Sequence, residues 1–210
     1  MIYNRQEAMR YMGAAAKDAG AEQLCDVVYL KLRNEVQTRS LIRRVDCNVS
    51  ADAVEVAGVK FQSKALAKHL QGCKEVLLFA ATLGQKVDSA IKRITLESLT
   101  EGNAAQAVAA SLIEVYCNQT LENYDTGALK QLARFSPGYG DWRLDEQKKF
   151  FQLLNCQSIG LTLTESCMMV PVKSVTAIVG LSDVEGRPWS RCEICGLDNC
   201  AYRKNEGCGK

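Results

Sequence analysis

Apolar residues recur along the chain at two different spacings, which predict a mixture of helices and short strands. An apolar residue at every third or fourth position predicts an amphipathic helix, whereas strict alternation or a short apolar run between turns predicts a strand. Helices are predicted over residues 4–18, 21–35, 64–71, 85–98 and 103–123, with one more after Asp145. Strands are predicted over residues 45–49, 54–56, 59–61, 75–81, 161–164 and 174–179. These segments do not follow the regular spacing of βαβ units, which favours an α+β fold.

Turn and capping residues mark several boundaries between these segments. Ala57 and Gly58 separate two short strands and indicate a hairpin. Ser63 is predicted to cap the helix that follows it, and Asp145 the helix that carries Phe150.

Weaker changes in pattern suggest how the chain is organised into domains. We expect an N-terminal lobe of helices and a hairpin over residues 1–73, a core over residues 74–186 and a Cys-rich tail over residues 187–210. The boundary at residue 73 is weakly marked, whereas Gly186-Arg187-Pro188 marks the start of the tail.

Composition and charge exclude several classes of protein. The chain has 210 residues, of which 47% are hydrophobic and 24% charged, as in ordinary soluble globular proteins. A formal net charge of +2 argues against a dedicated nucleic-acid surface. No stretch approaches 18 uninterrupted apolar residues, so no membrane span is expected. Residues 1–7 turn polar at once and lack the apolar region of a signal peptide, so we expect a cytoplasmic protein.

The chain has ten cysteines, which is many for a cytoplasmic protein, where disulfides are rare. Those within apolar segments are expected to be buried free thiols: Cys25, Cys47, Cys73, Cys117, Cys156 and Cys167. The single histidine, His69, is predicted to be a structural residue on a surface helix. Its isolation argues against His-rich metal sites and against Ser-His or Cys-His catalysis.

Four cysteines near the C-terminus have a spacing typical of metal sites. Cys192 and Cys195 are separated by two residues, and Cys200 and Cys208 could complete a tetrahedral set of thiolates. Such a set fits either zinc or an iron–sulfur cluster. The alternative is a flexible terminus with redox-active thiols.

A rigid turn between a cation and an aromatic ring predicts a binding loop. Pro137 and Gly138 fix the turn that separates Arg134 from Tyr139. A guanidinium binds a carboxylate through two parallel hydrogen bonds, and an aromatic face stacks on a flat or cationic partner. The loop would therefore suit a small amphoteric ligand with a carboxylate. A surface turn whose arginine pairs with a nearby acid is an equally weighted alternative.

Two further carboxylates are candidates for the same site. Glu114 lies in an apolar helical stretch and needs a partner, such as an amino group, if it is buried; an exposed position is the alternative. Glu165 and Ser166 follow 26 and 27 residues after Tyr139 in the sequence. They could bind a ligand, but anchoring the end of a strand is the favoured role.

Two motifs in combination resemble a known family. Arg-x-x-Pro-Gly-Tyr at residues 134–139 and Leu-Thr-Glu-Ser at residues 163–166 resemble the activation domain of cobalamin-dependent methionine synthase, which binds S-adenosylmethionine. Residues 79–84 and 112–116 resemble further segments of that domain, so the resemblance covers roughly residues 75–182. The residues after the second motif that also fit are Met169, Pro171, Ser174 and Val175. The chain has no room for the other domains of the enzyme and resembles a free-standing activation domain.

The resemblance implies a fold and a ligand site. The fold would have mixed helices around a mainly antiparallel, twisted sheet. Arg134 would contact the ligand carboxylate and Glu114 its amino group, while the backbone near Ser136 would meet the adenine. The complete set of implied ligand residues is Glu114, Arg134, Ser136, Gly138, Tyr139 and Glu165. No counterpart is found for a further tyrosine after the last strand, nor for an acidic contact near the N-terminus.

The function implied by the resemblance is reductive methylation, in which an electron donor reduces a partner's inactive cobalamin while S-adenosylmethionine donates a methyl group to it. The chain would thus be a component of a methyltransferase system for methionine biosynthesis. Its partners would be a cobalamin-binding methionine synthase or related corrinoid protein, and a flavodoxin or ferredoxin as electron donor. The alternatives are an activator of another corrinoid methyltransferase, or a metal or iron–sulfur redox protein on this scaffold. An independent methyltransferase is disfavoured, because no G-x-G-x-x-G loop is present.

Overall fold

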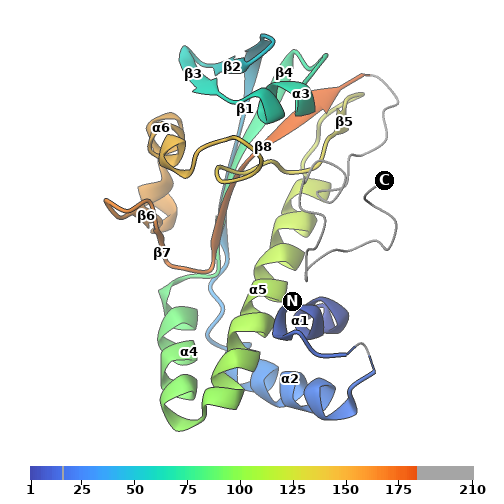
Figure 1. Cartoon of the computed structure of the whole chain (residues 1–210), viewed down its shortest axis with the longest axis vertical. Coiled ribbons are helices and arrows are strands. Elements are labelled where there is room, and N and C mark those ends of the chain that lie inside the picture. The colour runs from blue at the N-terminus through green and yellow to red at the C-terminus, as the bar shows by residue number, and fades with distance from the viewer. Residues whose placement is uncertain (16, 184–210) are drawn as a thin grey trace.

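A computed structural model of the chain describes residues 1–15 and 17–183 (Figure 1). The helices are α1 (Arg5–Met12), α2 (Ala19–Leu32), α3 (Lys64–His69), α4 (Gln85–Glu97), α5 (Leu99–Glu122) and α6 (Gln147–Leu153), with 3-10 turns at Leu144–Glu146 and Cys156–Ile159. The strands are β1 (Arg39–Val49), β2 (Ala53–Val56), β3 (Val59–Gln62), β4 (Glu75–Thr82), β5 (Lys130–Gln131), β6 (Thr162–Leu163), β7 (Met169–Val170) and β8 (Ser174–Ser182).

One antiparallel sheet organises the fold. Its six strands lie in the order β3-β2-β1-β4-β8-β5, and every neighbouring pair runs antiparallel. Strands β6 and β7 form a separate hairpin. Helices and sheet thus confirm the predicted α+β class.

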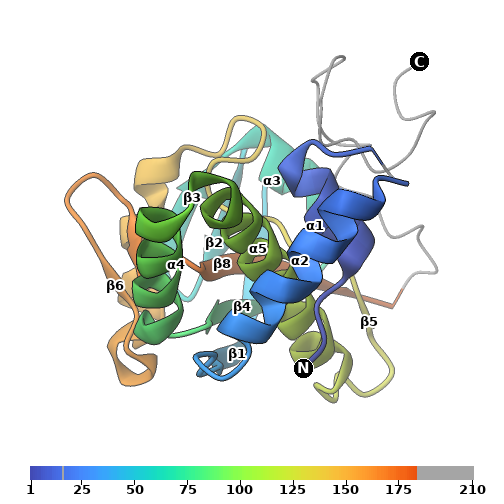
Figure 2. The ribbon, with the colours of Figure 1, turned by 90° about the horizontal axis from the view of Figure 1, so that it is seen from below.

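The central strand β4 separates two hydrophobic cores. Side chains alternate across a strand, so Leu77 and Phe79 lie on one face and Leu78 and Ala80 on the other. The first face packs against α1, α2, α4 and α5, and the second against α3, α6 and the 3-10 turn at Cys156–Ile159. Figure 2 shows α5 between α4 on one side and the α1–α2 pair on the other. Covering on both faces explains why β4 is a continuous apolar run.

Most predicted elements are confirmed, including the hairpin at Ala57-Gly58, the buried strand β4 and the Ser63 cap, which accepts a hydrogen bond from the backbone N–H of Leu66 at 3.0 Å. The predicted cap at Asp145 is wrong. Its carboxylate instead accepts from the Arg143 guanidinium at 2.6 and 3.0 Å, and α6 begins only after a 3-10 turn.

Two elements differ most in length from the prediction. The first helix ends at Met12 rather than residue 18, because Gly13 adopts a left-handed conformation (φ 71°) and closes it. The strand predicted at residues 45–49 begins at Arg39. Arg43 and Arg44 interrupt the alternation of apolar and polar residues there. In the sheet, Arg44 forms two hydrogen bonds with Glu75 on the neighbouring strand β4.

The sheet crosses the predicted boundary at residue 73. Strand β1, in the predicted N-terminal lobe, pairs with β4 from Arg39 opposite Thr82 to Asp46 opposite Glu75. The division into lobes stays a prediction. The predicted tail at residues 187–210, with its start at residues 186–188, lies outside the described residues.

The structure also shows how far the cysteines and the single histidine are buried. All six cysteines within apolar segments are free thiols, and only Cys47 is partly exposed. His69 is not on a surface: it is 5% exposed, so that part of its prediction is wrong. Within residues 1–15 and 17–183, no helix has both the length and the apolar character that crossing a membrane requires.

Candidate functional site

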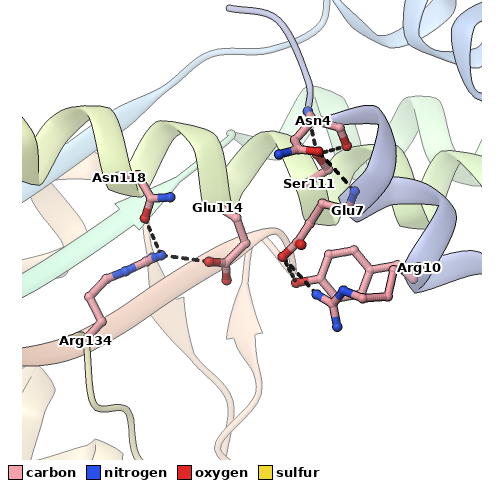
Figure 3. Close-up of polar contacts among 8 residues, drawn as sticks. Asn4, Glu7, Arg10, Ser111, Glu114, Asn118 and Arg134 are labelled. Carbon is pink, nitrogen blue, oxygen red and sulfur yellow. Dashed lines mark hydrogen bonds and ion pairs between the residues drawn. The ribbon is translucent and has the colours of Figure 1, made fainter. Parts of the chain in front are cut away.

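One face of α5 carries a row of polar residues beside α1. Ser111, Glu114 and Asn118 are three and four positions apart, so they project from the same side of the helix (Figure 3). The Ser111 hydroxyl accepts from the backbone N–H of Asn4 at 2.8 Å and donates to its carbonyl at 2.9 Å. These two bonds fix the start of α1 against the polar row.

Arg134 reaches the same row from the loop that follows β5. Its Nη2 donates to Glu114 Oε2 at 2.7 Å and to Asn118 Oδ1 at 2.9 Å (Figure 3). The pair is largely buried, with the side chains of Arg134 and Glu114 only 6% and 17% exposed. Arg134 does pair with an acid, as the alternative from the sequence held, but Arg134 itself is buried although Gly138 in the turn is exposed. Its buried Nη1 has no hydrogen-bond partner among the described residues.

A bulge in the strand pairing directs Arg134 toward α5. Gln131 pairs with Leu181 and Phe135 with Ile178, so four steps along this segment match three along β8. The extra residue is a β-bulge, a feature that re-aims side chains next to functional sites. Leu132 and Phe135 both pack in the core on the far face of the sheet, while Arg134 points to α5. In a regular strand Arg134 would share the face of Leu132.

The Pro-Gly turn forms as predicted and packs on an aromatic cluster. The backbone N–H of Tyr139 donates to the Ser136 carbonyl at 3.1 Å, and Gly138, at φ 94°, occupies a conformation that suits glycine. The Tyr139 and Phe135 rings form a T-shaped pair with centroids 5.7 Å apart, and Phe135 stacks on Trp142 at 6.1 Å. The loop is therefore held by buried rings.

Asp141 ties this loop to the start of α3. Its carboxylate accepts from the Ser63 hydroxyl and from the backbone N–H groups of Lys64 and Ala65, the latter at 2.9 and 3.0 Å. Desolvation acts to raise the pKa of Asp141, but these hydrogen bonds outweigh it, and the pKa lies below its ordinary value of 3.8.

Replacing Asp141 with asparagine is expected to destabilise the protein by about 1 kcal/mol, because one acceptor oxygen and the charge at the helix start are lost. A lowered pKa in the folded state means that the carboxylate stabilises the protein fully above pH 3.8 and progressively less as the pH falls below it. Urea unfolding at pH 7 and pH 3 should show the two proteins converging at the lower pH. An equal difference at both values would contradict this role.

Within the described residues, no hydrogen bond or ion pair joins Glu165 to the Glu114–Arg134 pair. It is exposed in the turn of the β6–β7 hairpin, which lies at the opposite edge of the molecule from α1 in Figures 1 and 2. The neighbouring Thr164 and Ser166 hydroxyls bond each other at 3.0 Å, and Thr164 accepts from the N–H of Met168. This arrangement supports the structural role favoured for the segment, and a ligand role for Glu165 stays a prediction.

Sequence reasoning missed three polar residues near the pair. Asn118 completes the Arg134 contacts, and Glu7 projects from α1 toward Glu114, with Arg10 bound to it at 2.8 Å (Figure 3). An Asn-x-x-Glu pattern starting at Asn4 resembles a capping box and could have placed Glu7 at the start of a helix. Only the packing of α1 on α5 brings it to the polar row.

The part of the chain that the structure describes holds no cluster of three or more histidine, cysteine or acidic residues arranged to bind a metal. The predicted metal ligands Cys192, Cys195, Cys200 and Cys208 lie outside the described residues.

Comparison with known proteins supports the resemblance. Residues 114–187 match the family described as vitamin B12 dependent methionine synthase, activation domain. The structure is similar to one described as the MetH reactivation domain bound to AdoHcy, with a TM-score of 0.61 and 17% sequence identity over 87% of this chain and 71% of that chain. No curated protein sequence matches the chain. The resemblance to the activation domain is therefore confirmed, and its fold extends over most of the chain.

Proposed function

We propose that this chain binds S-adenosylmethionine at the Glu114–Arg134 site and supports reductive methylation of cobalamin held by a partner methionine synthase. The observation that carries the proposal is the buried Arg134 guanidinium, which uses Nη2 for Glu114 and Asn118 and leaves Nη1 without a partner among the described residues. The matched family segment begins at Glu114 and includes the Arg134 loop. The AdoHcy in the similar structure supports a ligand of this class.

The residues of the site fit an amino-acid ligand. Arg134 Nη1 is a donor suited to a carboxylate, and the Glu114 carboxylate is an acceptor suited to an ammonium group. Asn118 accepts a second hydrogen bond from the same Nη2 that binds Glu114, so the position of the guanidinium does not depend on Glu114 alone. Gly138 presents no side chain at the turn, and Tyr139, whose backbone N–H donates to Ser136, adds a partly exposed aromatic ring.

The role of the chain would be to bind and orient. When bound, S-adenosylmethionine supplies a methyl group that its sulfonium already activates. The Glu114–Arg134 pair and the Pro-Gly turn would fix the amino-acid end of the ligand. Rigid placement of this kind promotes methyl transfer through proximity rather than acid–base chemistry. The corrinoid partner and an electron donor such as a flavodoxin or ferredoxin belong to the same proposal.

A zinc or iron–sulfur site in the Cys-rich tail, at Cys192, Cys195, Cys200 and Cys208, stays a separate proposal, which metal analysis of the anaerobically purified chain would test.

Calorimetric titration of the full chain with S-adenosylmethionine tests the proposed site. Wild type is expected to bind, and Arg134→Ala to bind at least about 30-fold more weakly, as expected for the loss of hydrogen bonds to a charged group. Arg143→Ala is the matched control, because Arg143 lies in the same segment but is exposed and pairs with Asp145. Intact protein that binds no S-adenosylmethionine, or equal loss in both variants, would contradict the proposal.

A further inference from the structure

The carbonyl of Ala133 leaves the strand pairing at the bulge beside Arg134. On either side the pairing is intact, with Leu132 N–H donating to the Gly180 carbonyl and Phe135 N–H to the Ile178 carbonyl, both at 2.9 Å. Between these bonds, the Ala133 carbonyl lies 2.8 Å from Nε2 of His69, the last residue of α3. A carbonyl in this partly buried position gains from such a partner once it has left the ladder.

Two contacts set the tautomer and the position of the neutral His69 ring. Burial lowers the pKa of His69, while the hydrogen bond to Ala133 acts in the opposite direction. A carbonyl can only accept, so the neutral imidazole carries its proton on Nε2. The ring also packs on Phe135, with centroids 5.1 Å apart. His69 therefore contacts the residues immediately before and after Arg134.

Helix α3 contacts the Arg134 loop at two points. Its first residues bind the Asp141 carboxylate, and its last residue binds the Ala133 carbonyl. Arg134 and Tyr139 lie between these two points in the sequence. A short helix that holds both ends of a loop limits the positions that the loop can adopt.

We propose that His69 is a positioning residue of the ligand site: its Nε2–H holds the Ala133–Arg134 bulge open, so that the Arg134 guanidinium is directed at Glu114 and Asn118. The importance of this role for ligand affinity rests on the proposed function, whereas its effect on Arg134 does not. The lone histidine would thus act on the site without touching a ligand.

Two substitutions separate the hydrogen bond from packing. His69→Phe keeps a ring against Phe135 but removes the donor, and His69→Gln places an amide N–H near the position of Nε2. In the free full-length protein, nuclear magnetic resonance should show the Arg134 Nη2–H signals, which donate to Glu114 and Asn118, exchanging slowly with solvent in wild type and His69→Gln. We expect exchange at least tenfold faster in His69→Phe. Equal exchange in all three proteins would overturn the proposal whether or not the chain binds S-adenosylmethionine.

Ligand affinity gives the second measurement. His69→Phe is expected to weaken S-adenosylmethionine binding about tenfold, which corresponds to the loss of about one hydrogen bond. His69→Gln is expected to restore most of the lost affinity. In an Arg134→Lys background, His69→Phe should weaken binding much less, because a residue that acts through Arg134 shows strong coupling to it. Equal effects in both backgrounds, matched by equal losses of thermal stability, would make His69 an ordinary core residue. Absence of binding by wild type would contradict the proposed function and leave the exchange measurement to decide the role of His69.

Discussion

Replacing Glu114 with leucine is expected to lower the free energy of unfolding by about 3 kcal/mol, because it leaves the buried Arg134 cation without its anionic partner. Asn118 would remain at 2.9 Å, but a neutral amide oxygen does not compensate the charge. Loss of the carboxylate should also abolish measurable S-adenosylmethionine binding. Guanidinium chloride unfolding and calorimetry measure the two effects on the same protein.

The double variant Glu114→Leu with Arg134→Met distinguishes stability from function. Apolar residues of similar volume can replace a buried ion pair with little loss or even a gain of stability, so this variant should be markedly more stable than Glu114→Leu alone. It should still fail to bind the ligand. Glu75→Leu is the matched control, because Glu75 pairs with Arg44 at a more exposed position and exposed pairs contribute little. A single Glu114 variant as stable as Glu75→Leu would show that the pair is not effectively buried.

The sequence predicted which residues of the site carry chemistry better than it predicted which of them contact one another. Arg134 and Tyr139 could be identified because a Pro-Gly turn between a cation and a ring is a local signal. Glu114 was expected to need a partner if buried; it is partly buried, and its described partner is Arg134 rather than an amino group. Two residues that are 20 positions apart in the chain meet only once α5 and the sheet have packed.

The bulge and its partner could not have been predicted from periodicity. Strand β5 has only two residues, too few for an alternating pattern, and the extra residue before Phe135 is defined by its pairing with β8. The prediction of a surface helix for His69 rests on its position between Lys68 and Leu70 alone. Its burial depends on Phe135, which lies 66 residues later in the sequence. Local sequence identifies which residues carry chemistry, and tertiary packing decides which of them meet.

Replacing Trp142 with alanine is expected to destabilise the protein by about 3–5 kcal/mol, because it leaves a cavity between strand β3 and the Arg134 loop. Trp142 is 1% exposed; its ring meets Phe61 of β3 edge-on at 5.4 Å and stacks on Phe135 at 6.1 Å. Since Phe135 adjoins Arg134, the cavity should also loosen the bulge and weaken ligand binding. Thermal and denaturant unfolding, followed by circular dichroism, measure the first effect, and calorimetry the second.

Two further variants test whether ring packing is the cause. Trp142→Phe should be less than half as destabilising as the alanine variant, because the indole N–H is buried without a partner among the described residues and its removal breaks no hydrogen bond there. Leu144→Ala is the matched control, since Leu144 lies two positions away but is 49% exposed, and its truncation should change stability little. If Trp142→Ala resembled Leu144→Ala, the aromatic cluster would not be what holds the Arg134 loop. If Trp142→Phe were as damaging as the alanine variant, the indole N–H would matter more than the packing of the ring.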